Sequence, residues 1–310
     1  MSQPGSDFSV LIGAYERGNL LYIRAVTPLH VGIGRAGGVI DLPVQKDLYG
    51  YPEIYGSSLK GSLRASCMRK ARRDECIGYF GSEPGEAESK PGKVVVLDTK
   101  LLLIPVRVLR GVYGYITSPL LLKQFIDYLS IIKHEKYEEL LEVVEDISKD
   151  LDRDKVLVTS KAKNKYSIKI NNKDKIIINE EFWLEPLIKN EDVKKILNII
   201  PDELRKKIGL EEDSLLIVSD EDDTSLQIAE KSLIRLQRIR LEETKKIVAR
   251  GQLWSEEYVP RNTILYTIIL YTDEKTMNEF KEKVLGGGRS YLIIGGHETI
   301  GKGLTELYVV

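Results

Sequence analysis

The stretch Gly295-Gly296-His297-Glu298-Thr299-Ile300-Gly301-Lys302-Gly303, close to the C-terminus, says most about this chain. From Gly296 to Lys302 it fits a phosphate-binding P-loop, but the next position, which should be Ser or Thr, is Gly303. A P-loop needs that hydroxyl to hold Mg²⁺ and a long helix after its lysine. Here a short apolar run typical of a strand follows. A nucleotide-dependent enzyme that uses residues 296–302 therefore fits poorly, and an ATP-binding assay would decide this alternative.

A second glycine-rich stretch, Gly32-Ile33-Gly34-Arg35-Ala36-Gly37, fits the dinucleotide pattern G-x-G-x-x-G, with Glu53 at a plausible spacing for a ribose contact. That motif needs a strand directly before it and a helix directly after it. Residues 27–31 separate it from the strand-like run 20–26, and Pro43 and its β-branched neighbours disfavour a helix afterwards. Both stretches are better interpreted as loops in which backbone can approach a phosphate chain.

The composition is that of a soluble globular protein with a substantial core. The chain has 310 residues, of which 42% are hydrophobic and 30% are charged. Its net charge of -1 excludes a globally basic nucleic-acid-binding protein, so such binding must come from local patches. Cys67 and Cys76 form no CxxC motif, so we expect neither a disulfide nor a zinc site. Without a signal peptide or a long apolar run, we expect a cytoplasmic protein.

Basic residues are concentrated in 60–73, which holds six of them and no acidic residue. Apolar residues recur there at helical spacing, and Gly56-Ser57-Ser58 supplies cap candidates, so the pattern predicts a basic amphipathic helix over 58–73. Lys60 and Arg64 share a face near its start, where unpaired N–H groups attract phosphate. An ordinary solvated surface helix is the alternative.

Two further charged segments can each be explained by a structural role as well as by a binding role. Lysines between 161 and 175 surround an alternating stretch with a turn at Asn171-Asn172, which predicts a hairpin over 166–178. These lysines form either a second basic binding cluster or the protection of an exposed sheet edge. Acidic residues gather in 211–223, which we interpret as a solvated loop because the spacing matches no EF-hand.

The order of the elements predicts an α+β fold in one elaborated domain. The pattern predicts helices over 119–149 and 191–208. Strand-like runs occupy 20–26, 94–97, 101–106, 214–218, 232–240, 246–254, 262–272 and 291–294.

A series of short motifs runs along the chain in a fixed order. They are Pro28-Leu29-His30-Val31-Gly32-Ile33-Gly34, Gly38-Val39-Ile40-Asp41-Leu42-Pro43, Gly56-Ser57-Ser58-Leu59-Lys60-Gly61-Ser62-Leu63-Arg64, Phe80-Gly81, Asp98, Pro105-Val106-Arg107, Gly111-Val112-Tyr113, Tyr115-Ile116-Thr117-Ser118-Pro119, Leu253-Trp254-Ser255-Glu256-Glu257-Tyr258-Val259-Pro260 and the glycine-rich loop 295–303. Together they resemble one family, the backbone subunit of Cmr-type (type III-B) CRISPR effector complexes in the repeat-associated mysterious protein (RAMP) superfamily. The match begins near residue 20, is poor over 120–230, and owes its specificity to the order of the motifs.

The resemblance implies a ferredoxin-like (RNA-recognition-motif-like) palm over roughly 18–118 and 255–310. It also implies a helical, variable insertion over 119–215 and a thumb β-hairpin over 232–253, turning through residues 241–245. Copies would stack along a CRISPR RNA (crRNA) and cut the paired target RNA with a divalent metal, Mg²⁺ or Mn²⁺. The implied partners are a large Cas10-type subunit and a small helical subunit. Since base pairing would read the sequence, the near-zero net charge is no obstacle.

The resemblance also implies site residues. Asp41 falls on the family's cleavage aspartate, which ligates a metal or helps to deprotonate a ribose 2′-OH. His30 would act as acid or base, and Glu256 and Tyr258 would complete the catalytic set. The expected RNA-binding residues are Ser57, Ser58, Lys60, Arg64, Gly296, Gly301, Lys302 and Gly303.

Alternatives remain at each of these positions. Asp41 alone would be interpreted as a turn residue before Pro43. His30 and His297 could be structural, and the sequence leaves open whether Glu256 or Glu257 faces the site. A non-catalytic crRNA-binding scaffold with a silent Asp41 is the alternative function.

Overall fold

We describe the protein from a computed structural model, for residues 9–36, 38–82, 85, 89–242 and 248–310. The helices are α1 (Gly56–Lys70), α2 (Arg73–Phe80), α3 (Pro119–Ile131), α4 (Tyr137–Asp150), α5 (Ser160–Tyr166), α6 (Asn190–Leu197), α7 (Asp202–Ile208), α8 (Thr224–Ser232) and α9 (Glu274–Lys283). The strands are β1 (Ser9–Ile12), β2 (Tyr15–Ala25), β3 (Val94–Val96), β4 (Lys100–Val108), β5 (Val112–Thr117), β6 (Lys155–Val158), β7 (Ile168–Ile170), β8 (Lys173–Ile178), β9 (Phe182–Ile188), β10 (Leu215–Val218), β11 (Ile234–Leu241), β12 (Val248–Tyr258), β13 (Ile264–Tyr271), β14 (Arg289–Ile293) and β15 (Leu304–Val309). Short 3-10 turns occupy η1 (Glu221–Asp223), η2 (Gly286–Gly288) and η3 (Glu298–Ile300).

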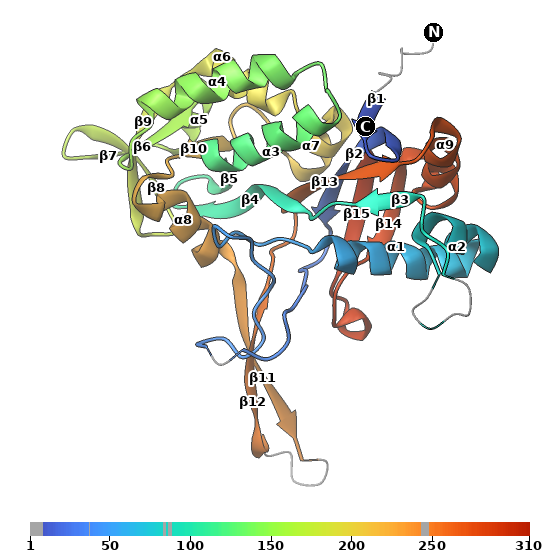
Figure 1. The fold of residues 1–310 in the computed structure, drawn as a ribbon. Coiled ribbons are helices and arrows are strands. Elements are labelled where there is room, and N and C mark those ends of the chain that lie inside the picture. Colours follow the sequence, from blue (N-terminus) through green and yellow to red (C-terminus); the bar gives the residue numbers. More distant parts are fainter. Residues whose placement is uncertain (1–8, 37, 83–84, 86–88, 243–247) are drawn as a thin grey trace.

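A large sheet runs through the molecule with helices on both faces, as Figure 1 shows. Over the described residues the strand order is β14-β15-β2-β13-β4-β5-β10-β6-β9-β8-β7, with β1 added beside β2 and β3 beside β13. The pairs β2–β13, β2–β15 and β4–β13 are antiparallel, whereas β5–β10 and β6–β9 are parallel. Strands and helices therefore mix without strict alternation, as the predicted α+β class requires.

The core lies on both faces of this sheet. Every residue of β13 is buried, which explains its unbroken apolar run. Leu265 and Ile269 face the layer that contains α1 and α9, and Tyr266 and Ile268 face the layer that contains α3, α4 and α6. Side chains alternate across a strand, so one strand supplies both cores.

The predicted strands are confirmed, with shifts of a few residues at their ends, but three helical predictions need correction. The helix over 191–208 is two helices, α6 and α7, because residues 198–201 interrupt it and Pro201 is the N-cap of α7. The helix over 119–149 is two helices, because the chain breaks at residues 132–136, where Lys133 has a φ of 49°. The region 119–215 was expected to be a helical insertion, yet its strand β6 pairs with β10 and its strand β8 with β4. Strand β9 lies between β6 and β8, so the three strands extend the main sheet.

The basic helix begins at Gly56 and ends at Lys70, so the prediction of one helix over 58–73 is correct except at its ends. The expected serine cap is wrong. Tyr55 is the N-cap and makes no capping bond through its side chain; the Asp98 carboxylate accepts a hydrogen bond from the Gly56 N–H at 2.7 Å instead. Gly56 suits this position because a Cβ there would lie 2.5 Å from the carbonyl oxygen of Val96.

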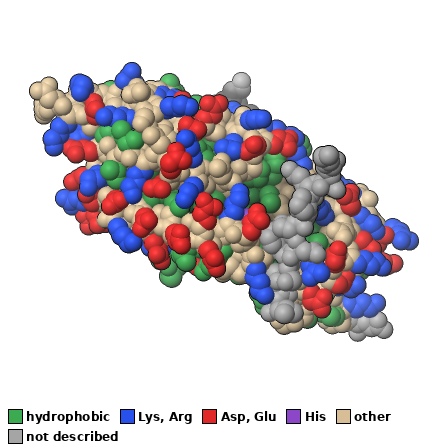
Figure 2. Space-filling view, turned by 90° about the horizontal axis from the view of Figure 1, so that it is seen from above, with side chains coloured by type: hydrophobic (Ala, Val, Ile, Leu, Met, Phe, Trp, Pro, Cys, Tyr) green, Lys and Arg blue, Asp and Glu red, His purple; other side chains and the backbone are tan. Residues whose placement is uncertain are grey.

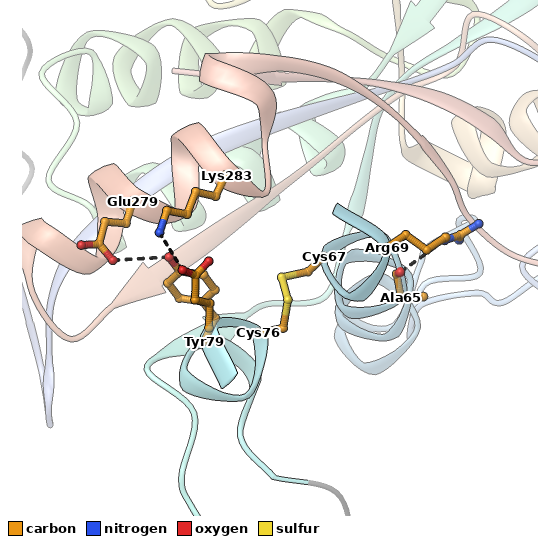
Figure 3. Close-up of a disulfide and its surroundings, with 8 residues drawn as sticks. Ala65, Cys67, Arg69, Cys76, Tyr79, Glu279 and Lys283 are labelled. Atoms are coloured by element: carbon orange, nitrogen blue, oxygen red, sulfur yellow. Dashed lines mark hydrogen bonds and ion pairs between the residues drawn. A yellow bond between two sulfur atoms is a disulfide. The ribbon is translucent and has the colours of Figure 1, made fainter. Parts of the chain in front are cut away.

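The expectation of no disulfide is also wrong, because Cys67 and Cys76 are bonded to each other (Figure 3). The extended backbone of Ala71 and Arg72 ends α1 and lets α2 fold back, which brings the two Cα atoms to 6.0 Å. That distance is ordinary for a disulfide. A spacing of nine carries no such signal unless the break between the helices is known.

The β11–β12 hairpin projects away from the sheet (Figure 1). Its register is antiparallel and pairs Ile234 with Tyr258 and Arg238 with Trp254. Residues 243–247, which include part of the turn predicted over 241–245, lie outside the described residues. The hairpin therefore has a defined root and a defined register up to Leu241 and Val248.

The lysine-rich hairpin predicted over 166–178 is present as β7 and β8, with left-handed backbone at Asn171 and Asn172. Its lysines are paired: Lys163 and Lys169 with Asp174, and Lys173 and Lys175 with Glu185. These ion pairs favour the interpretation as a protected sheet edge.

Three acidic residues of the stretch 211–223 form ion pairs: Glu212 with Lys161, Asp213 with Lys165 and Asp222 with Arg153. Acidic and basic side chains are likewise interspersed over the face seen from above in Figure 2. Among the described residues, no helix is long and apolar enough to cross a membrane.

Candidate functional site

Asp41 lies in an extended loop that runs beside β12. Its neighbour Leu42 donates its N–H to the Ser255 carbonyl and accepts from the Glu257 N–H, both at 3.0 Å. Oδ2 of Asp41 accepts from the backbone N–H and the hydroxyl of Ser255, each at 2.8 Å. The Asp41 side chain is nevertheless exposed, so its carboxylate is oriented by the protein and open to a ligand.

The same contacts set the charge of Asp41. The backbone and side-chain hydrogen bonds from Ser255 lower the pKa of the Asp41 carboxyl, because they stabilise its ionised form. Asp41 is therefore an anion at neutral pH.

His30 is buried at the base of this loop. Its Nδ1 lies 2.8 Å from the backbone carbonyl oxygen of Glu257, which can only accept, so Nδ1 carries a proton. In the neutral ring, Nε2 is then the free base. A Cβ on Gly32 would lie 2.7 Å from Nε2, so glycine at this position lets the backbone pass beside that atom.

A polar cluster surrounds His30. The Tyr258 hydroxyl donates to Glu256 Oε2, and its oxygen is 3.0 Å from His297 Nδ1. Since the hydroxyl hydrogen is used, His297 Nδ1 is the donor in that contact. The rings of His297 and His30 stack at 4.9 Å with an interplanar angle of 2°.

The ionisation states in the cluster follow from burial and hydrogen bonding. Burial alone would raise the pKa of Glu256, but hydrogen bonds from Tyr258 and Trp254 outweigh it and lower that pKa. Burial lowers the pKa of His297, and burial together with the Glu256 carboxylate raises the pKa of Tyr258. An ionised Glu256, a protonated Tyr258 and a neutral His297 result at neutral pH.

The structure resolves which glutamate faces this cluster. Both side chains are 1% exposed, but strand alternation sends them to opposite sides. Glu256 contacts Tyr258 and Trp254, whereas Glu257 accepts from Arg235 at 3.2 Å and from the Val44 N–H at 3.4 Å.

Asp41 is not part of the cluster. It bonds to Ser255, which alternates with Trp254 and Glu256 along β12 and so points to the other side of the strand. Among the described contacts, none joins Asp41 to His30, Glu256 or Tyr258. The expected catalytic set is thus divided into two groups on opposite sides of β12: Asp41 with Ser255 on one side, and the cluster around Tyr258 on the other.

The N–H groups of the glycine-rich loop form hydrogen bonds with carbonyl oxygens of the protein's own backbone. The N–H of Gly296 donates to His30 and that of Gly303 to Pro28, at 2.9 and 3.0 Å, and the Gly301 N–H donates to Glu298. A Cβ on Gly303, whose φ is 81°, would lie 2.5 Å from the Ile294 oxygen. These N–H groups are therefore occupied. Lys302 places Nζ 5.2 Å from the Tyr258 ring centre, and strand β15 follows it.

A groove of about 460 Å³ separates α1 from the glycine-rich loop. Three predicted RNA-binding residues, Ser57, Ser58 and Gly296, line it, as does Arg69, which the sequence did not single out. Lys60 and Arg64 lie on the neighbouring face of α1 and do not line it. Gly301, Lys302 and Gly303 are also outside its lining.

A metal ion would find few protein ligands here. Within the described parts of the chain, no group of three His, Cys, Asp or Glu side chains is placed to hold one. Mg²⁺, however, is commonly bound by one or two carboxylates together with substrate phosphates and water. Both Ser255 bonds use Oδ2, so Oδ1 of Asp41 could serve as a single protein ligand to such an ion.

The chain matches known proteins in sequence and in fold. Residues 22–306 match the model of the RAMP superfamily. The chain belongs to the RAMP superfamily. Among curated RAMP relatives, it is 33% identical to the "CRISPR system Cmr endoribonuclease Cmr4" of Pyrococcus furiosus, over 93% of this chain and 94% of the relative. It is 32% identical to the "CRISPR system CMR subunit Cmr4" of Saccharolobus solfataricus, over 92% and 94%.

Solved RAMP structures agree. A chain of the "Type III-B Cmr-beta bound to cognate target RNA" superposes with a TM-score of 0.74 at 31% identity, covering 96% of this chain and 98% of that one. A chain of "oligomeric Cmr4 from Pyrococcus furiosus" has a TM-score of 0.66 at 26% identity, with 94% and 97% covered.

Sequence reasoning missed Ser255, Trp254 and Arg69. Ser255 and Trp254 lie inside a motif that was recognised. The role of Ser255 depends on the loop that reaches β12 from 214 residues away, whereas Trp254 acts through its hydrogen bond to Glu256. Arg69 could have been found from its place on the helical face of Ser58 and Ser62.

Proposed function

We propose that this protein is the backbone subunit of a type III-B CRISPR effector complex, binds crRNA, and cuts the paired target RNA as an endoribonuclease. The observation that carries the catalytic part is Asp41, a carboxylate that Ser255 orients and keeps ionised on an exposed loop. The relatives support it, since one is named an endoribonuclease and one structure is a complex with cognate target RNA.

The palm is assigned from topology. The elements β2, α1, β3, β13, α9 and β15 follow the β-α-β-β-α-β order of a ferredoxin-like unit, and their strands lie in the order β15-β2-β13-β3. Both helices pack on one face of these strands, where Leu59 and Phe280 share a buried cluster.

The β11–β12 hairpin is assigned as the thumb. It projects away from the large sheet (Figure 1), and the Asp41 loop runs beside its strand β12. Ile239 and Leu253, which are directly opposite in its register, are both exposed. Exposed apolar side chains on a projecting hairpin favour contact with another molecule. The next copy along the crRNA is the proposed neighbour, and a large Cas10-type subunit and a small helical subunit complete the cytoplasmic complex.

The proposed reaction is attack of a ribose 2′-oxygen on the adjacent phosphate. The O2′–P bond forms, the P–O5′ bond breaks, and the products are a 2′,3′-cyclic phosphate and a 5′-hydroxyl. Asp41 holds the 2′-OH through its hydrogen and attracts the proton as it leaves. His30, when protonated at Nε2, is the candidate donor to the departing O5′. A divalent metal, Mg²⁺ or Mn²⁺, held by Asp41 and RNA phosphates would neutralise charge on the phosphate.

The test is to purify the complex from its host, sequence the bound RNA and offer it labelled target RNA. Bound crRNA and cleavage of complementary RNA, but not of scrambled RNA, are expected. Bound crRNA with intact target would leave the scaffold function. Loss of cleavage in EDTA, restored by Mg²⁺ or Mn²⁺, would support the metal; full activity in EDTA would remove it.

A further inference from the structure

A second cleft lies at the root of the β11–β12 hairpin, apart from Asp41 and from the groove beside α1. Its volume is about 450 Å³, within the range of small-ligand pockets, roughly 300–1,000 Å³. Strands β4 and β5 form one wall, the end of α8 another, and the turn from β12 to β13 a third. We propose that this cleft binds one unpaired nucleotide of the RNA, an inference that rests on the proposed function.

The wall formed by β4 and β5 carries exposed side chains. Tyr113 and Arg107 are directly opposite in the β4–β5 register, so their side chains stand on the same face as neighbours. Both are exposed, Tyr113 by 46%. Helix α7 ends at Ile208, and its C-cap residue, Gly209, lies beside Tyr113.

Tyr113 is held in place although it is exposed. Its ring meets Tyr115 edge-on at 5.9 Å, and its hydroxyl lies 3.2 Å from where a Cβ of Gly209 would be. A fixed, accessible aromatic ring is the feature on which proteins stack a single unpaired base.

The charge of the cleft suits a phosphate. Arg107, Lys231 and Arg261 line it, and no acidic side chain is among its lining residues. Arg107 and Lys231 have ion-pair partners outside the lining, Glu180 and Glu181. Arg261 is exposed and, among the described residues, has no ion-pair partner. It is therefore the cation most available to an anionic ligand.

Another groove of the protein differs from this cleft in the balance of acidic and basic residues that line it. The groove beside α7 is also lined by three cations, Lys161, Arg205 and Lys206, but it carries four acidic residues, Asp202, Glu211, Glu212 and Asp213. In a chain of net charge -1, a cleft with cations and no acid concentrates anions. Base stacking and one phosphate contact together select a nucleotide over a simple anion.

The position favours RNA as the occupant over an acidic peptide. Leu233, just before β11, and Pro260, just after β12, both line the cleft. The cleft therefore lies where both strands of the hairpin join the rest of the chain. A peptide would supply the charge but no base to cover Tyr113.

The test measures binding of a fluorescent single-stranded octauridine to the full chain by anisotropy. Tyr113→Leu should weaken binding roughly fivefold or more, since stacking is worth about 1–3 kcal/mol per base, while Tyr113→Phe should bind like the wild type. Arg261→Ala should weaken it several-fold. Lys161→Ala, from the mixed-charge groove, is the matched control and should change nothing. Unfolding curves verify that each variant folds.

A second measurement does not depend on variants. Ultraviolet cross-linking of 4-thiouridine RNA to wild-type protein, read by mass spectrometry, should label the peptide that contains Tyr113. No label there, or unchanged affinity in both Tyr113→Leu and Arg261→Ala, overturns the cleft. Unchanged RNA binding with lost subunit assembly would identify a protein-docking site and also overturn it. If the wild-type complex still cuts target RNA in those cases, the proposed function stands without this cleft.

Discussion

Oδ2 of Asp41 accepts hydrogen bonds from both the backbone N–H and the hydroxyl of Ser255, each at 2.8 Å, although 214 residues separate them. The hydroxyl of Ser255 also accepts from the Asp41 N–H at 2.9 Å. Ser255 thus fixes the loop, the carboxylate orientation and its charge at once. The proposed chemistry depends on this contact more than on any other single one.

Replacing Ser255 tests that dependence. Ser255→Ala keeps the backbone bond but removes the hydroxyl, so target cleavage should fall roughly three- to tenfold while RNA binding stays unchanged. Ser255→Thr, which keeps the hydroxyl, should retain most activity. Single-turnover cleavage by reconstituted complexes gives the comparison, and equal rates for Ser255→Ala and wild type would contradict it.

The pH dependence of the same variant has a defined sign. Asp41 has a depressed pKa because Ser255 stabilises its ionised form, so activity that needs the anion persists above that pKa and is lost as pH falls through it. With one bond removed, the pKa rises toward its ordinary value. The acidic limb of the pH–rate profile should therefore shift to higher pH in Ser255→Ala. A shift to lower pH would contradict the assignment.

Glu306 should dominate acid stability near the sheet edge. It is fully buried, and hydrogen bonds from Lys207 and Arg289 outweigh the effect of burial and lower its pKa to about 2. A depressed pKa means stability that is present above the unfolded value of about 4.5 and is lost as pH falls toward 2. Glu306→Gln should cost about 2 kcal/mol at pH 7 and little at pH 2. Urea unfolding at both pH values tests this, and an equal cost at each would refute it.

Reducing the disulfide should weaken the protein without stopping RNA binding. The bond between Cys67 and Cys76 closes a short loop, for which chain entropy gives about 2–3 kcal/mol. A reductant or the Cys67→Ser/Cys76→Ser double variant should lower stability by this amount in urea unfolding. Identical midpoints with and without reductant would show that the thiols are unbonded in solution.

The basic residues of α1 should differ in their effect on RNA. Arg69 lines the groove beside the glycine-rich loop, whereas Lys60 and Arg64 lie on the adjacent face. Arg69→Ala should weaken RNA binding uniformly across sequences and reduce the salt slope by about 1, because one phosphate contact is lost. The Lys60→Ala/Arg64→Ala pair tests whether the adjacent face also contacts RNA. Anisotropy titrations at several salt concentrations measure both; an unchanged slope for Arg69→Ala would remove the groove from the RNA path.

Periodicity located the regions of α1, α3, α4, α6 and α7 and strands such as β13, because their burial follows from local patterns. It did not predict α2, α5, α8 and α9 or the strands β6 and β9. It did not reveal the break after Ile131, where no Gly or Pro marks the turn, or the Asp98 cap on α1 from outside the helix. The Cys67–Cys76 bond was missed for the same reason, since it depends on how α2 folds back.

The candidate site was likewise predicted from the sequence only in part. Residue types and motif order named Asp41, His30, Glu256 and Tyr258. Only the register of the Asp41 loop against β12 separates Asp41 from the cluster around Tyr258 and brings in Ser255. The glycines of 296–303 were expected to approach RNA, but their N–H groups donate to nearby protein backbone. Long-range register is the information that the sequence pattern lacks.

The most direct test of the account is single-turnover cleavage of guide-complementary RNA by complexes reconstituted with wild-type or Asp41→Asn protein. Asparagine keeps the size and can still accept from Ser255, but it removes the negative charge. The account predicts unchanged crRNA and target binding with cleavage reduced on the order of 10²-fold or more. Wild-type cleavage by the Asp41→Asn complex would contradict it and would make this subunit a scaffold, with the nuclease elsewhere in the complex.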